Sequence, residues 1–151
     1  MSGFRRGRGA ARLEMGEAIS FEDVLTVITV LLLLRLGSPH TAVLGRDPDR
    51  GFVDMSVNPG AVPVPGVLIL RVDGPLVFAS IDGALDDLRA ALDAAVQPPG
   101  VVVLDLSATY EIDVTAADAL ASLVDDLRLE GTELRFAGAR APVREYAARL
   151  G

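Results

Sequence analysis

The stretch from Val101 to Leu120 constrains the fold of this 151-residue chain more than any other segment. Five of the six residues from Val101 to Leu106 are apolar, which predicts a strand that is covered on both faces. Asp113 is a good N-cap, and apolar residues recur after it at helical spacing, which predicts a helix over residues 114–130. A strand that feeds the start of a helix is a usual position for a binding site in an α/β sheet.

Strand and helix patterns alternate in the rest of the chain. Ser80 is the expected N-cap of an amphipathic helix over residues 80–96. The turn signature Asp73-Gly74-Pro75 lies between two apolar runs, 67–72 and 76–79, and predicts an antiparallel hairpin. The other expected elements are a half-buried strand over 52–57, a strand over 133–137 and a last helix over 141–150 opened by Pro142. Together they predict an α/β fold over residues 52–151, a mixed sheet with helices mainly on one face.

Composition excludes most kinds of catalytic and metal chemistry. The chain has no cysteine, a single histidine (His40) to which we assign no chemical role, and no lysine, since all of its basic residues are arginine. A thiol nucleophile, a P-loop and a Schiff-base lysine are therefore excluded, and a metal site built on several histidines is poorly supported. The net charge of −7 argues against a nucleic-acid partner. We expect a non-catalytic binding or regulatory module without a metal or cofactor.

The first 18 residues form a basic arm rich in glycine and arginine. Such an arm is expected to be an unstructured, solvated tail, and the alternative is a contact for anionic lipid headgroups.

Residues 19–37 are predicted to form a hydrophobic helix. The run from Val24 to Leu34 is uncharged but shorter than the roughly 20 apolar residues that a membrane span needs. It could lie in the membrane interface, be the remnant of a longer span, or act as a signal peptide, although Glu22 and Asp23 beside the run argue against the last. Membrane contact through residues 19–36 is expected, and residues 38–66 are expected to be a linker with one strand.

Candidate site residues lie where strands end and helices begin. The predicted interaction or regulatory loop comprises Ser80, Asp105, Ser107, Glu111, Asp113 and Thr115. Thr115 is a possible phosphosite in the first turn of its helix, but the simpler hypothesis is that it helps to cap that helix. Asp105 and Ser107 could line a ligand groove or simply satisfy backbone groups of the loop. Phe78 and Ala79 are expected to pack in the core.

Three segments in this order resemble a STAS domain, the module shared by bacterial anti-sigma-factor antagonists and the cytoplasmic C-termini of SulP-type sulfate and anion transporters. They are VPGVLILRVDGPLVFAS (64–80), VVVLDLSATYEIDVTAADAL (101–120) and GTELRFAG (131–138). The resemblance covers residues 67–151. In antagonists a phosphorylated serine follows the aspartate of the loop, whereas Val114 occupies that position here. The transporter branch is therefore the better match.

The upstream segment LLLLRLGSPHTAVLGRDPDRGFVDM (31–55) is similar to the exit of the last transmembrane helix of SulP proteins and the strand that follows it. The chain thus resembles a transporter C-terminus cut at both ends, without the membrane domain that transports the anion. This resemblance implies a regulatory or protein-interaction domain at the cytoplasmic face of the membrane, or in the cytoplasm.

Several partners are compatible with this resemblance. The domain could dock against a transporter membrane domain or another regulatory protein, and the alternative is a stand-alone antagonist in a partner-switching circuit. Nucleotide binding is a weaker option, because no glycine-rich phosphate loop is present. We expect the functional surface to be the loop 107–115 together with the helix start at Ser80. Its acidic character suits an Arg- or Lys-bearing protein better than sulfate.

Overall fold

The computed structural model describes residues 20–36, 39–141 and 144–145 of the chain. The predicted basic arm over 1–18 lies outside these residues, and so does most of the predicted last helix over 141–150.

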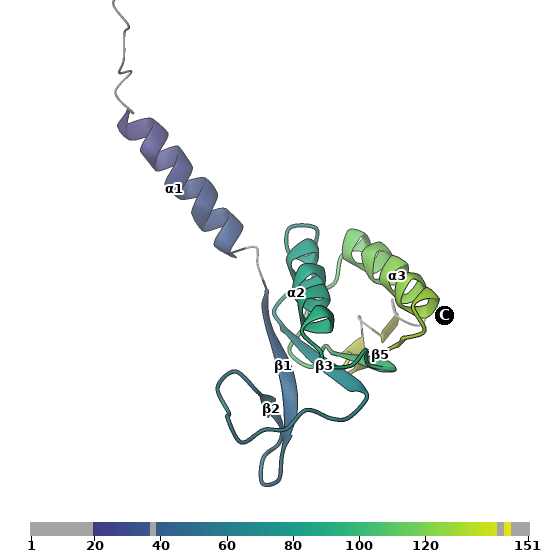
Figure 1. Cartoon of the computed structure of the whole chain (residues 1–151). Coiled ribbons are helices and arrows are strands. Elements are labelled where there is room, and N and C mark those ends of the chain that lie inside the picture. The colour runs from purple at the N-terminus through teal and green to yellow at the C-terminus, as the bar shows by residue number, and fades with distance from the viewer. Residues whose placement is uncertain (1–19, 37–38, 142–143, 146–151) are drawn as a thin grey trace, which may run out of the picture.

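A mixed sheet of five strands forms the centre of the domain (Figure 1). Its strands are β1 (His40–Asp47), β2 (Gly51–Asp54), β3 (Val67–Asp73), β4 (Val101–Asp105) and β5 (Glu133–Ala137), and their order is β2-β1-β3-β4-β5. β1 runs antiparallel to both β2 and β3, whereas β3, β4 and β5 are parallel. The mixed α/β sheet predicted from the sequence is confirmed.

Two helices, α2 (Ile81–Asp93) and α3 (Val114–Leu129), cover one face of this sheet (Figure 1). Alternate residues of β3 and β4 point toward the helices and are buried, which explains why burial has a period of two along both strands. The prediction that the strand at 101–106 is covered on both faces is wrong for the described residues, because Val101 and Val103 on the other face remain partly exposed. The most deeply buried apolar side chains of the core are Leu70, Val72, Leu76, Leu88, Val102, Leu106 and Ala116.

The segment between α1 and β3 contains more sheet than the sequence predicted. We expected a linker with one strand, but β1 and β2 form a hairpin there, and β1 also pairs with β3. A hydrogen bond from Thr41 to Asp87 ties β1 to α2. The sequence pattern of β1 is weak because its core, Ala42 to Gly45, does not alternate between apolar and polar residues.

The predicted hairpin of 67–72 with 76–79 is wrong. Both sides of β3 are already paired, with β1 on one side and β4 on the other, so no ladder is free for residues 76–79. Leu76 instead makes an isolated parallel bridge with Ile112. The turn after Asp73 therefore carries the chain out of the sheet toward the start of α2.

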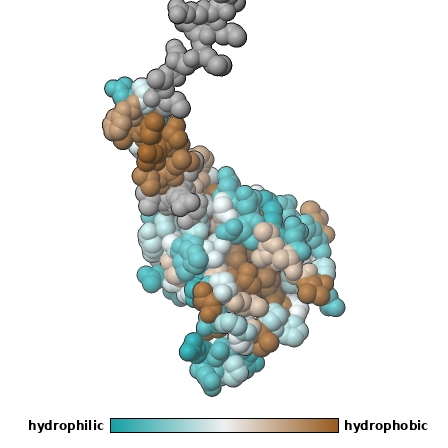
Figure 2. Space-filling model, turned by 60° about the vertical axis from the view of Figure 1, so that its left-hand side comes forward, coloured by the Kyte–Doolittle hydropathy of each residue, from teal (hydrophilic) through white to brown (hydrophobic). Residues whose placement is uncertain are grey.

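The first helix, α1 (Phe21–Leu36), stands away from the sheet (Figure 1). Ser20 and Asp23 cap the start of this helix reciprocally. The Oγ of Ser20 accepts the N–H of Asp23 at 3.3 Å, and the Oδ2 of Asp23 accepts the N–H of Ser20 at 3.1 Å. Its large apolar residues from Phe21 to Leu32 are exposed, and they form the apolar surface of the helix in Figure 2. None of the helices among the described residues has the combination of length and apolarity that crossing a bilayer requires.

Candidate functional site

Two loops meet at the carboxyl ends of β3 and β4, over residues 74–80 and 106–113. The N–H of Leu76 donates to the carbonyl of Glu111 at 2.9 Å, and the N–H of Asp113 donates to the carbonyl of Leu76 at 3.2 Å. Thr109 is fully buried, and its hydroxyl donates to the Val72 carbonyl at 3.1 Å. These bonds make the two loops a single surface at the starts of α2 and α3.

The carboxylate of Asp113 connects the two helix starts. Its Oδ1 accepts the N–H of Ala116 at 2.8 Å, as expected for the N-cap of α3, and its Oδ2 accepts the N–H of Phe78 at 2.7 Å. These two bonds, with a smaller contribution from the N–H of Thr115, lower the pKa of Asp113. Asp113 is therefore ionised at neutral pH and places a fixed negative charge between the loops.

Ser80 occupies the N-cap position of α2, as the sequence predicted, but its side chain does not cap that helix. The hydroxyl donates to the Pro75 carbonyl at 2.8 Å and accepts the N–H of Val77 at 3.0 Å. Because Ser80 is buried, it holds the loop in shape and is not available to a partner.

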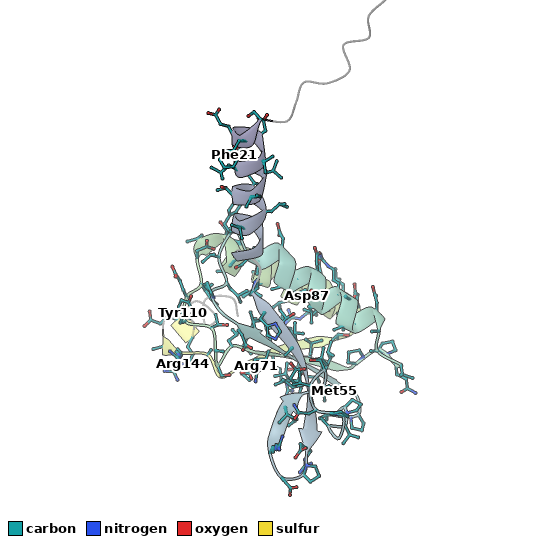
Figure 3. The ribbon with its side chains drawn as sticks, turned by 90° about the vertical axis from the view of Figure 1, so that its left-hand side faces the viewer. Phe21, Met55, Arg71, Asp87, Tyr110 and Arg144 are labelled. Carbon is teal, nitrogen blue, oxygen red and sulfur yellow. The ribbon has the colours of Figure 1, made fainter. Side chains whose placement is uncertain are left out.

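Three large exposed side chains lie on these two loops and at the start of α3. Tyr110 and Val114 fall within the loop 107–115 that the sequence predicted as the functional surface, whereas Phe78 was not predicted for the site. Phe78 is 74% exposed, Tyr110 60% and Val114 61%, and we call these three residues the apolar rim. Tyr110 projects outward from its loop (Figure 3). The prediction that Phe78 and Ala79 pack in the core is wrong, since both are exposed. Tyr110 could have been found as an aromatic residue between the polar residues Thr109 and Glu111, whereas Phe78 lies in an apolar run that gives no such signal.

Glu111 and Thr115 are exposed beside the apolar rim. Thr115 lies in the first turn of α3, where the side chain of Asp113 is the cap. No basic residue occurs between Asp105 and Leu127, so this stretch of the chain contributes only negative charge, through Glu111 and Asp113, to the surface beside the start of α3.

Asp105 and Ser107 lie at the end of β4 and stabilise the local backbone. The Oδ1 of Asp105 accepts the N–H of Ser107 at 3.0 Å, which closes a short turn. Gly138, with φ of +67°, approaches both residues so closely that a Cβ there would lie 2.7 Å from the Cβ of Ser107. The structure therefore places these two residues in a packed strand end.

Acid–base or metal chemistry has little support at this surface. In residues 20–36, 39–141 and 144–145, no cluster of three or more His, Cys, Asp or Glu side chains could hold a metal ion. What the surface offers is an exposed apolar rim with fixed negative charge, an arrangement that suits contact with another protein.

Comparisons with known proteins agree with this arrangement. The family model of the STAS domain matches residues 58–151. The chain is similar to a probable sulfate transporter of Mycobacterium tuberculosis, with 35% identity over 90% of this chain and 24% of the relative. Probable sulfate transporter 4.2 of Arabidopsis thaliana is 32% identical over 76% of this chain and 18% of its own length.

A structure of the murine anion transporter Slc26a9 contains a similar fold. It superposes with a TM-score of 0.69 over 85% of this chain and 21% of the transporter, at 19% identity. This similarity concerns the fold alone. The chain spans about a quarter or less of the length of these relatives.

Proposed function

This chain belongs to the STAS domain family, and from that premise we propose that it is a non-catalytic regulatory module of a SulP-type anion transporter. The match of the family model confirms the resemblance predicted from the sequence. We further propose that the loops 74–80 and 106–115 bind a protein partner, either the transporter membrane domain or another regulatory protein.

The observation that supports a transporter origin is the extent of the similarity. The family model matches residues 58–151, whereas the similarity to the Mycobacterium tuberculosis protein covers 90% of the chain. A continuous stretch of that length necessarily includes α1 as well as the domain. The region of similarity to that protein, which is named as a probable sulfate transporter, therefore extends beyond the domain to the part of this chain that contains α1.

The proposed role of α1 is contact with the membrane. An exposed helix that is apolar all round is unfavourable in water, and burial of its side chains in lipid or against transmembrane helices removes that cost. Its 16 residues would extend about 24 Å, less than the roughly 30 Å of a bilayer core. With α1 at the membrane, the domain would lie at the cytoplasmic face.

The proposed partner surface is the apolar rim of Phe78, Tyr110 and Val114 with its acidic neighbours. Aromatic residues at the centre of an interface contribute much of its binding free energy, and the charges around them select the partner. Glu111 and Asp113 favour a partner that presents Arg or Lys side chains. The same charges disfavour sulfate, so we do not propose that this domain holds the anion.

Binding to a transporter membrane domain in nanodiscs tests this function. We expect the full chain to bind the membrane domain of the Mycobacterium tuberculosis relative, and a Phe78→Ser/Tyr110→Ser double variant to bind roughly tenfold more weakly or worse. Val96→Ser is the matched control, because Val96 is fully exposed after the end of α2, outside the two loops. Equal affinities of the double variant and the control would overturn the proposed surface.

The antagonist alternative has a separate test. Val114 has no hydroxyl at the position where antagonists carry a phosphorylated serine, and its side chain is exposed there. Incubation with an anti-sigma kinase and ATP should therefore leave the intact mass unchanged. Stoichiometric addition of one phosphate at Thr115 would favour the partner-switching circuit over the transporter origin.

A further inference from the structure

A groove lies between the C-terminal halves of α2 and α3. The two helices start close together, because Asp113 at the N-cap of α3 holds the backbone of Phe78 in the loop before α2. They spread apart toward their C-terminal ends (Figure 1). The space that opens between them has a volume of about 270 Å³, and we call it the helix groove.

The floor of the helix groove is apolar. Leu123 and Leu127 of α3 are almost fully buried, and Leu92 of α2 is partly buried against the same core. Leu129, the last residue of α3, also lines the groove, but its side chain is 88% exposed. A large apolar side chain that stands in water beside an apolar floor contributes free energy of binding when a partner covers both.

The two helices beside the groove are strongly acidic. They carry seven aspartates against two arginines, and so hold a net charge of −5 out of −7 for the whole chain. Asp126 and Glu130 line the groove on the α3 side. Arg89, the basic residue of the lining, forms a salt bridge with Asp86 at 3.7 Å. The aspartates of the two helices are all exposed, and they are Asp82, Asp86, Asp87, Asp93, Asp118, Asp125 and Asp126.

We propose that the helix groove binds a cationic amphipathic helix of a cytosolic protein. The apolar side chains of that helix cover the leucines of the floor, and its Arg and Lys side chains lie against Asp126 and Glu130. A helix fits between two helices because its side chains at helical spacing form a ridge that enters the groove. Charge complementarity selects a cationic helix, since an acidic one would be repelled by the aspartates on both sides.

The helix groove lies at the opposite end of the domain from the apolar rim. β1 begins at His40, opposite Asp73 at the carboxyl end of β3, so the chain arrives from α1 at the end where α2 and α3 start. The groove lies toward the other ends of these two helices. With α1 at the membrane, a placement that rests on the proposed function, the groove faces the cytosol and its acidic helices avoid the anionic leaflet. A cytosolic protein can therefore reach the groove while the apolar rim is occupied.

Fluorescence anisotropy of a labelled helical peptide tests this proposal. The probe is a peptide of about 16 residues with leucines on one face and Lys and Arg on the other, and two control peptides replace the basic residues by Glu or the leucines by Ser. The full chain is held in nanodiscs of neutral lipid, which cover α1 and do not attract the basic residues, and empty nanodiscs give the background. We expect saturable binding of one cationic peptide per chain, roughly tenfold tighter than that of either control peptide.

Variants at exposed positions locate the bound peptide. Leu129→Ser and the double variant Asp126→Asn/Glu130→Gln should each weaken its binding by roughly tenfold. Asp82→Asn/Asp118→Asn removes the same charge near the starts of the same helices and is the matched control for the acidic pair.

Three results would overturn the proposal. They are binding no stronger than to empty nanodiscs, equal affinity for the cationic peptide and its Glu counterpart, and equal losses in the groove variants and the control. Binding that falls with Phe78→Ser/Tyr110→Ser but not with Leu129→Ser would also overturn it, because the basic helix would then bind at the apolar rim. That last result would leave the proposed function in place.

Discussion

Asp113 accepts a hydrogen bond from the backbone N–H of Phe78 at 2.7 Å, although 35 residues separate them in the sequence. The same carboxylate caps α3, so this side chain adds to the backbone bonds of Leu76 in fixing the α2 loop relative to the start of α3. The backbone of Phe78, whose ring is exposed, is thereby held at the N-cap of α3. The acidic and apolar parts of the candidate site are thus coupled through one residue.

Asp113→Ala should destabilise the domain, because the N–H groups of both Ala116 and Phe78 lose their acceptor. We expect the Tm to fall by roughly 4–8 °C, the usual effect of losing an N-cap in a domain of this size. Asp118→Ala, an exposed position in the second turn of α3, is the control. Thermal unfolding followed by circular dichroism measures both, and equal midpoints would contradict the coupling role of Asp113.

The stabilisation by Asp113 should depend on pH in the acid range. Hydrogen bonds from Ala116 and Phe78 hold its pKa below the ordinary value, so the folded state binds its proton less readily than the unfolded state. This contribution is present in full above about pH 4 and is lost as the pH falls through the lowered pKa. Urea unfolding of the wild type and Asp113→Asn should therefore differ more at pH 7 than at pH 3. A difference that does not shrink at pH 3 would be inconsistent with this origin.

Gly138→Ala should destabilise the end of β5 by about 1–3 kcal/mol. Its φ of +67° disfavours any side chain, and a Cβ would lie 2.9 Å from the Oδ1 of Asp105 as well as 2.7 Å from Ser107. Gly66→Ala separates backbone strain from steric clash, because Gly66 has a φ of +73° but no atom within 4 Å of the position that a Cβ would take. Chemical denaturation should show the larger loss for Gly138→Ala. Equal losses would mean that backbone strain alone matters.

Removal of residues 1–38 should abolish binding to lipid vesicles and leave the domain folded. α1 contributes none of the residues of the buried core. The deletion must end before His40, because β1 starts there and pairs with β3. Co-sedimentation with anionic vesicles and circular dichroism are the measurements. Unfolding of the shortened chain would show that the domain needs α1.

Sulfate and nucleotides should produce no saturable shifts of the amide signals of residues 107–115. The negative charges of Glu111 and Asp113 repel anions, and the chain has no glycine-rich phosphate loop. Titration followed by amide chemical shifts is the measurement. Saturation at sub-millimolar ligand would replace the protein-interaction hypothesis by ligand sensing.

Local sequence determined the elements whose formation depends only on residues close together in the chain. α2 and α3 follow from the spacing of their apolar residues, and Asp113 was identifiable as an N-cap because capping depends on neighbours within one turn. The parallel arrangement of β3, β4 and β5 follows from the alternation of strands with helices. The location of the loops at the strand ends could therefore be predicted before their surface was known.

Tertiary structure decided what depends on partners far away in the chain. β3 can pair with only two strands, and it pairs with β1 and β4. The expected pairing of β3 with residues 76–79 is therefore excluded. Phe78 was expected in the core, but its ring is exposed, and Ser80 was expected in the interaction loop, but its side chain is buried. The backbone hydrogen bonds between Leu76 and the loop at Asp113 set the path of that segment. Sequence patterns report which side chains prefer burial, but the exposure of a loop residue is decided by the long-range hydrogen bonds that direct its backbone.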